Sequence, residues 1–135
     1  MGRILAIDYG EQRIGLALSD PLKIFASPYK TIINKNKDHS ISLIENIIKI
    51  EDVELIVVGL PLAMSGKSTD QTLKVKKFVD KLLIEGFKIE YVDERWSSKA
   101  AKRSMVEQGF KTGHNKSVVD QTAAALFLQQ YLDQK

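Results

Sequence analysis

The run ELIVVGL at residues 54–60 constrains the fold more than any other feature of this chain. A continuous run rich in β-branched residues is typical of a strand that is buried on both faces, and such a strand needs helices on both sides of its sheet. An amphipathic helical pattern over residues 72–87 and a strand-like run over residues 88–94 follow it. Strand, helix and strand in this order predict two parallel neighbouring strands.

The first fifty residues predict an antiparallel arrangement. Residues 3–10 and 13–20 are apolar runs of strand length, and the short Gly-containing segment between them suits a hairpin. A third strand is expected within residues 24–33, where Pro28 marks a sheet edge or a bulge. Residues 40–50 then show helical spacing of isoleucine.

Two further helical patterns complete the chain, over residues 97–109 and 116–134. The full order of elements, βββαβαβαα, predicts an α/β protein with a mixed five-stranded sheet flanked by helices. Because 135 residues give room for one hydrophobic core, we expect a single domain over residues 1–135.

Composition excludes several classes of protein. Hydrophobic residues make up 44% of the chain and charged residues 27%, which is ordinary for a globular protein and excludes a fibrous or disordered one. The absence of cysteine excludes a disulfide framework and a thiolate metal site. No run approaches the roughly 18 apolar residues of a membrane span. We therefore expect a cytoplasmic protein that does not enter a membrane; its net charge of +3 permits a polyanionic partner without requiring one.

Acidic residues follow the predicted parallel strands. Asp8 ends the first apolar run, and Asp93 and Glu94 end the last strand. Functional groups of such sheets gather at the carboxyl ends of the parallel strands, so these acids should converge with the loop that begins at residue 59. Carboxylates bind Mg²⁺ or Mn²⁺, and two such ions about 3.5–4 Å apart can promote phosphodiester hydrolysis.

Asp120 is a further candidate, near the start of the last helical pattern. It shares a helical face with Ala123, Ala124 and Phe127, so its carboxylate should project beside small, core-like residues. A structural role stays open, because an acid in the first turn of a helix is stabilised by the helix dipole.

The other acids have structural alternatives too. Asp8 suits a turn before Gly10, and Arg95 can neutralise the acids at the end of the last strand.

Four motifs together resemble one known family, the YqgF family, also called RuvX or the pre-16S rRNA nucleases. The motifs are AIDYGEQRIGLALSD, VVGLPLAMSGKST, VDERWSS and VVDQTAAALFL, and they span nearly the whole chain in the family's order. The resemblance implies an RNase H-like fold related to RuvC-type resolvases. It also implies a catalytic set of Asp8, Glu94 and Asp120, with Asp93 as an additional metal ligand and Glu94 as the preferred second acid. The implied cofactor is Mg²⁺ or Mn²⁺ at a two-metal site.

The implied function is hydrolysis of phosphodiester bonds in nucleic acid, with the 5′ end of pre-16S rRNA as the preferred substrate. The alternatives are resolution of Holliday junctions in branched DNA and a non-catalytic nucleic-acid-binding module associated with transcription. The oligomeric state is open between monomer and homodimer. The chain departs from the family pattern at Ala63 and Ser65, where Asn and Asp are usual, and this weakens any metal-binding role for that loop.

Basic residues near these motifs are candidates to hold the phosphates of a nucleic acid. The candidates are Arg13, Lys67, Arg95, Lys111 and Lys116. Arg13 can instead pair with an acid such as Glu94 and orient the site. The stripe of Lys74, Lys77 and Lys81 is interpreted as a solvated helix face, and His114 as a surface-loop residue.

Aromatic residues near the same edge are candidates to stack on an unpaired base. Tyr9 and Trp96 are the two, although Tyr9 can equally pack beneath the loop.

Two nucleotide-binding alternatives fit poorly. The GKS sequence at residues 66–68 resembles the end of a P-loop, but Pro61 occupies the position of the first glycine and has no N–H to offer a phosphate. The AIDYG sequence also resembles the first phosphate loop of actin-like ATPases and sugar kinases. Those proteins need two such domains around the nucleotide, whereas this chain has room for one.

Overall fold

The computed structural model describes residues 2–93 and 116–134. The elements in chain order are β1 (Arg3–Tyr9), β2 (Arg13–Ser19), β3 (Ala26–Ile33), α1 (Lys37–Ile50), β4 (Val53–Leu60), α2 (Asp70–Ile84), β5 (Ile89–Asp93) and α4 (Lys116–Asp133). The strands form one five-stranded sheet in the order β3-β2-β1-β4-β5. β1 pairs antiparallel with β2, and β2 with β3, whereas the β1–β4 and β4–β5 pairs are parallel. The predicted mixed α/β sheet is confirmed; the predicted helix at 97–109 lies outside the described residues.

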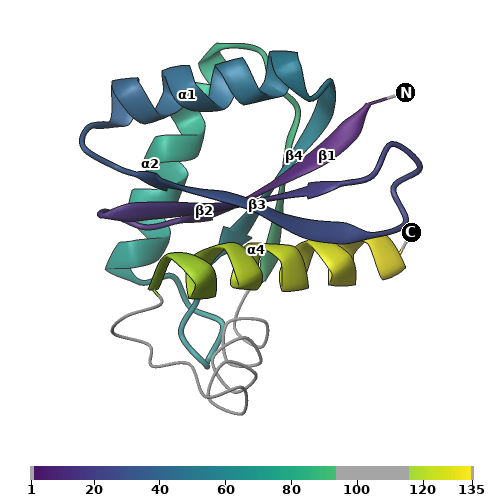
Figure 1. The fold of residues 1–135 in the computed structure, drawn as a ribbon. Coiled ribbons are helices and arrows are strands. Elements are labelled where there is room, and N and C mark those ends of the chain that lie inside the picture. The colour runs from purple at the N-terminus through teal and green to yellow at the C-terminus, as the bar shows by residue number, and fades with distance from the viewer. Residues whose placement is uncertain (1, 94–115, 135) are drawn as a thin grey trace.

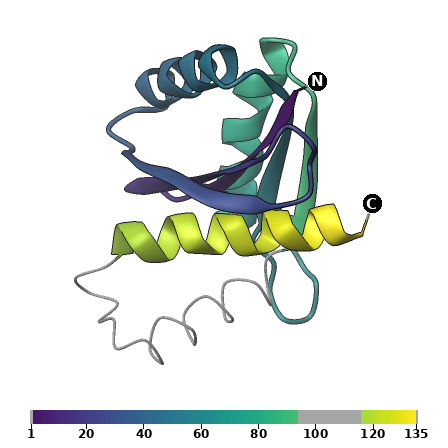
Figure 2. The same ribbon diagram turned by 45° about the vertical axis from the view of Figure 1, so that its right-hand side comes forward.

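Helices cover both faces of the sheet, as the buried run in β4 predicts. α4 crosses one face, and α1 and α2 lie on the other (Figures 1 and 2). The side chains of β1 alternate between two cores: Leu5, Ile7 and Tyr9 belong to the core with α1 and α2, while Ile4 and Ala6 belong to the core with α4. This alternation decides which face each functional side chain of β1 and β2 occupies.

The helices begin where polar side chains can cap them. Asn36 precedes α1, and its side-chain oxygen accepts the backbone N–H of His39 at 2.8 Å. Thr69 and Thr72 form a reciprocal capping box at the start of α2. Because Asn36 supplies the cap, α1 starts at Lys37, three residues before the isoleucine spacing alone predicts.

β3 is an edge strand and accommodates a proline. The β2–β3 register shifts between Leu16 and Ala17, which lie opposite Lys30 and Pro28 respectively. Proline lacks the N–H that a central strand would use, so an edge position and a bulge both suit it. Both expectations for Pro28, a sheet edge and a bulge, are confirmed.

Among residues 2–93 and 116–134, no helix is both long enough and apolar enough to span a bilayer.

Candidate active site

Asp8 lies one residue before the carboxyl end of β1, on the face that α4 covers. Because side chains alternate along a strand, Asp8 lies on the same face as Ile4 and Ala6, which pack against α4. Asp8 is half-buried. Since β1, β4 and β5 are mutually parallel, their carboxyl ends lie at one edge of the sheet, as the sequence predicts. Asp8 therefore stands at the edge where α/β proteins carry their functional groups.

Gly15 brings α4 against the sheet beside Asp8. In the β1–β2 pair Gly15 lies directly opposite Asp8. A Cβ atom at Gly15 would lie 2.4 Å from both the carbonyl carbon and the carbonyl oxygen of Asp120. Only a residue without a side chain fits there, so the glycine allows the Asp120 backbone to approach the strand pair that carries Asp8.

Asp120 belongs to the second turn of α4, because the helix begins at Lys116. Asp120 therefore does not stabilise α4 through the helix dipole, because that effect is confined to the terminal turn. Ala124 and Phe127, one and two turns further along, are fully buried against the sheet. The predicted small-residue face is confirmed, and Asp120 extends that face toward the strand ends.

Arg13, the first residue of β2, forms an ion pair with Asp120. Its Nε donates to Asp120 Oδ2 at 3.0 Å, and each side chain is 26% exposed. Arg13 therefore contacts an acid, as one sequence-based alternative expects, and the acid in contact among the described residues is Asp120. A partly buried charge-assisted hydrogen bond of this kind fixes the orientation of the carboxylate.

Asp93 occupies a different face of the sheet from Asp8. It ends β5 and lies opposite Leu60 in the parallel register. Ile89 packs into the α1–α2 core and Val92 against the α4 core, so alternation places Asp93 on the α1–α2 side. β4 also separates β5 from β1, which puts their backbones roughly 10 Å apart. Asp93 therefore does not share a face of the sheet with Asp8.

Of the predicted basic residues, Lys67 is described in full and is exposed in the loop between β4 and α2. That loop follows the carboxyl end of β4, at the same edge as Asp8. Lys116 is the first residue of α4. The remaining predicted residues lie outside the described part of the chain: Glu94, Arg95, Trp96, Lys111 and His114.

Tyr9 is a packing residue and not a platform for bases. Its residue is 6% exposed, and its ring centroid lies 4.4 Å from that of Phe78. A base cannot reach a ring that is covered in this way. Of the two sequence-based interpretations of Tyr9, the one that packs it beneath the loop is confirmed.

Carboxylate oxygens are the ligands that a divalent cation such as Mg²⁺ prefers. Asp8 and Asp120 supply hard carboxylate oxygens on one face of the sheet. Within residues 2–93 and 116–134, no group of three Asp, Glu, His or Cys residues could hold a metal ion. Mg²⁺ commonly binds through one or two carboxylates and completes its shell with water and substrate phosphate, so the donor chemistry of these two acids suits such an ion.

Sequence reasoning missed Gly15 as the residue that allows α4 to approach the sheet beside Asp8. The available signal was a glycine within the apolar strand RIGLALS, which indicates a bulge or a close backbone approach. Its partner, Asp120, is distant in the sequence and appears only in the folded chain.

A family model described as "RuvX: Holliday junction resolvase" matches residues 2–134. The chain belongs to the RuvX family. A relative from Roseiflexus sp. (strain RS-1) is 41% identical over 134 residues, covering 98% of this chain and 94% of its own length. A relative from Fusobacterium nucleatum is 42% identical over 139 residues, covering 100% and 99%. Both carry the name "Putative pre-16S rRNA nuclease". The resemblance seen in the sequence motifs is thereby confirmed.

Solved structures share the fold of this RuvX-family chain. Thermus thermophilus RuvC in complex with a Holliday junction substrate superposes with a TM-score of 0.64 at 13% identity, covering 99% of this chain and 95% of that one. Fowlpox virus resolvase with Holliday junction DNA gives 0.63 at 8% identity, covering 98% and 97%. These similarities show an RNase H-like, RuvC-like fold, as expected.

Proposed function

We propose that this RuvX-family chain is a metal-dependent nuclease that hydrolyses phosphodiester bonds and processes the 5′ end of pre-16S rRNA. The observation that carries the proposal is the pairing of Asp8 with Gly15, which brings Asp120 of α4 against the same strands. Two carboxylates, one near the carboxyl end of β1 and one on the helix packed beside it, suit a hard cation and a phosphate. Relatives about 40% identical over nearly full length carry the rRNA nuclease name, and this supports RNA as the substrate.

In this proposal Asp8 and Asp120 hold Mg²⁺ or Mn²⁺, and Glu94 supplies the third acid of a two-metal site. Glu94 is preferred to Asp93 because alternation places Asp93 on the opposite face from Asp8. When bound, the metal ions activate water and stabilise the leaving oxygen. Arg13 orients the Asp120 carboxylate through its Nε–H. The exposed Lys67 side chain, together with Arg95, Lys111 and Lys116, attracts the phosphates of the substrate.

The proposed setting is the cytoplasm, because ribosomal precursors are processed where ribosomes are made. The described helices include no membrane span.

Cleavage of two substrates tests the proposal. A pre-16S fragment carrying the unprocessed 5′ end and a four-way DNA junction are incubated with the protein at equal salt, with Mg²⁺, with Mn²⁺ or with EDTA. Metal-dependent cleavage of the RNA fragment at its 5′ end is the expected result. Asp8→Asn should abolish that cleavage and leave the fold intact, because like-charged carboxylates repel one another when no cation is present. Asp80→Asn, an exposed carboxylate on α2, is the matched control and should cleave normally.

Branched DNA is the second candidate, because the family description names Holliday junction resolution. A resolvase cuts two symmetric strands and therefore requires a two-fold homodimer, whereas processing of one RNA end can use a monomer. Symmetric junction cutting by a dimer, without RNA cleavage, would replace the RNA proposal with this one.

A further inference from the structure

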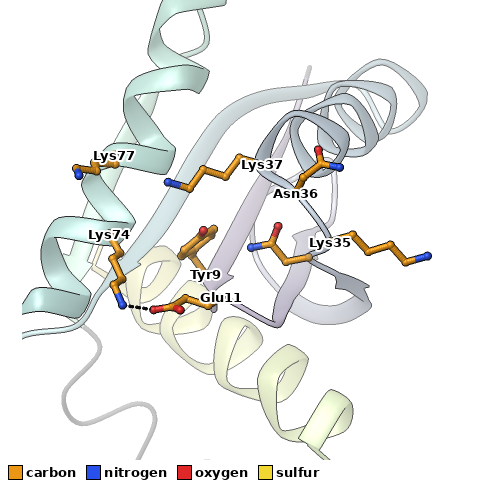
Figure 3. Close-up of a pocket in the computed structure, with 8 residues that line it drawn as sticks. Tyr9, Glu11, Lys35, Asn36, Lys37, Lys74 and Lys77 are labelled. Carbon is orange, nitrogen blue, oxygen red and sulfur yellow. Dashed lines mark hydrogen bonds and ion pairs between the residues drawn. The ribbon is translucent and has the colours of Figure 1, made fainter.

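A lysine-lined pocket lies on the opposite face of the sheet from Asp8, at the same end of β1. It has a volume of about 450 Å³ and lies between the β1–β2 turn (residues 10–12), the start of α1 and the first turns of α2 (Figure 3). Asp8 and Tyr9 are consecutive residues of β1, so their side chains point to opposite faces. The pocket and the candidate active site therefore lie at the same end of β1, on opposite faces of the sheet.

The pocket carries an excess of positive charge. Four lysines and one acid, Glu11, line it. Lys37 extends toward α2 and Lys74 contacts Glu11, whereas Lys35 points away from them (Figure 3). The hydrogen bond to the Glu11 carboxylate raises the pKa of Lys74 above its ordinary value. Lys77 comes from the next turn of α2.

The neighbouring acids offset this charge only in part. Asp38, in the first turn of α1, pairs with Lys81 at 3.0 Å. Asp70 stands at the first position of α2, where an acid stabilises the helix.

The base of the pocket is held in place by buried and hydrogen-bonded groups. Asn34 donates from Nδ2 to the carbonyl oxygen of Gly10 at 3.0 Å and accepts the Ser40 hydroxyl at 2.8 Å. These bonds tie the β1–β2 turn to the start of α1. Tyr9 packs on Phe78 beneath them. The lysines thus extend from a fixed frame built by three separate segments.

We propose that this pocket binds backbone phosphates of the single-stranded part of the RNA substrate, beyond the cleavage site. The lysine ammonium groups act as point charges that attract phosphate regardless of base. Tyr9 is covered and offers no stacking surface, so the pocket contacts the backbone and does not select a sequence. A flexible RNA strand that passes over the β1–β2 turn reaches both the pocket and Asp8. The identity of the ligand as RNA rests on the proposed nuclease function.

Salt-dependent binding tests the pocket separately from cleavage. Fluorescence anisotropy of a labelled single-stranded pre-16S fragment is measured over a salt series, in EDTA and in an Asp8→Asn background. Each lost phosphate contact lowers the slope of log K against log salt by roughly 0.7 for a single strand. The Lys37→Ala/Lys77→Ala pair should therefore reduce the slope by about 1.4. Lys49→Ala/Lys88→Ala removes the same charge from exposed positions away from the pocket and should leave the slope unchanged.

The outcomes distinguish the pocket from the nuclease proposal. If both lysine pairs change the slope equally, the pocket proposal is overturned, even if the wild-type protein cleaves RNA. If the pocket pair alone lowers the slope while no cleavage is found, the pocket proposal stands and the nuclease proposal fails. If the pocket pair weakens binding only of a four-way junction, the assignment to single-stranded RNA is wrong. Thermal melting of each variant checks that the fold is unchanged.

Discussion

Replacing Gly15 with alanine tests whether the close approach of α4 to the sheet builds the site. A Cβ atom there would lie 2.4 Å from two backbone atoms of Asp120, whereas an ordinary contact begins at 3.4 Å. The backbone must therefore move apart by about 1.0 Å, the difference between these distances. A flexible side chain cannot absorb the displacement, because the obstructing atoms belong to the helix backbone.

Two effects of Gly15→Ala follow from that displacement. Forcing an extra methyl group into a packed contact destabilises a protein by about 1–3 kcal/mol. A misplacement of about 1 Å at a catalytic group can lower the reaction rate by about 100-fold. We expect both losses, measured by urea unfolding and by the rate of cleavage of the pre-16S fragment.

Gly86→Ala is the matched control for this substitution. Gly86 has a φ of +88°, and a Cβ atom there would meet nothing within 4 Å. Gly86→Ala should lower the stability by about 1–2 kcal/mol, because the alanine must adopt a left-handed backbone conformation. The cleavage rate should not change. A Gly15→Ala protein with wild-type stability and wild-type cleavage would refute the argument that this glycine positions Asp120.

Three further measurements test other parts of the structure. Arg13→Gln removes a cation that competes with metal for Asp120, so Mg²⁺ should raise the melting temperature of this variant more than that of the wild type; equal increments would count against a metal site at Asp120. Phe78→Ala should destabilise the fold by about 3–5 kcal/mol in urea unfolding, because its side chain is fully buried, while Leu73→Ala on the exposed side of the same helix should change stability little. Backbone N–H groups, chiefly that of Phe25, lower the pKa of Asp20 below its ordinary value of 3.8, so the stabilisation it provides at neutral pH is lost as the pH falls through that lowered value. An NMR titration that places this pKa at or above 3.8 would contradict the assignment.

Periodicity predicted the elements of this fold because each pattern depends on burial that the folded chain confirms. The run in β4 is buried from Ile56 to Gly59, as a strand covered on both faces must be. The start of α1 was harder to predict, since its first turn contains no isoleucine and depends on the Asn36 cap. Apolar spacing reports the buried face of a helix, whereas its ends depend on single polar residues.

The acids of the candidate site could be proposed from the sequence, whereas the residues that contact them could not. Asp8 and Asp120 could be named from strand ends and from a small-residue face. The Arg13–Asp120 bond joins residues 107 positions apart, and no local pattern contains that information. The choice between Asp93 and Glu94 depends on alternation in β5, where a one-residue shift exchanges the two faces of the sheet. Register had to be known before Asp93 could be assigned to the α1–α2 side.

Lysines on α2 illustrate the same limit. Lys74 and Lys77 fit the pattern of a solvated helix face, and both residues are exposed. The fold adds Glu11 from the β1–β2 turn and Lys37 from α1, and so converts part of that face into one wall of a pocket. Solvation and ligand binding are compatible at such a position, because a phosphate can replace water around an exposed ammonium group.

The β1–β2 hairpin carries residues of the candidate acidic site on one face of the sheet and residues of the lysine pocket on the other. Asp8 and Arg13 lie on the side of α4, where Arg13 pairs with Asp120. Tyr9 points the other way and supports the floor of the lysine pocket. The candidate acids and the pocket lysines therefore lie on opposite sides of the sheet. In the proposals above, an RNA strand that crosses the β1–β2 turn contacts the lysines on one face of the sheet and the candidate hydrolytic acids on the other.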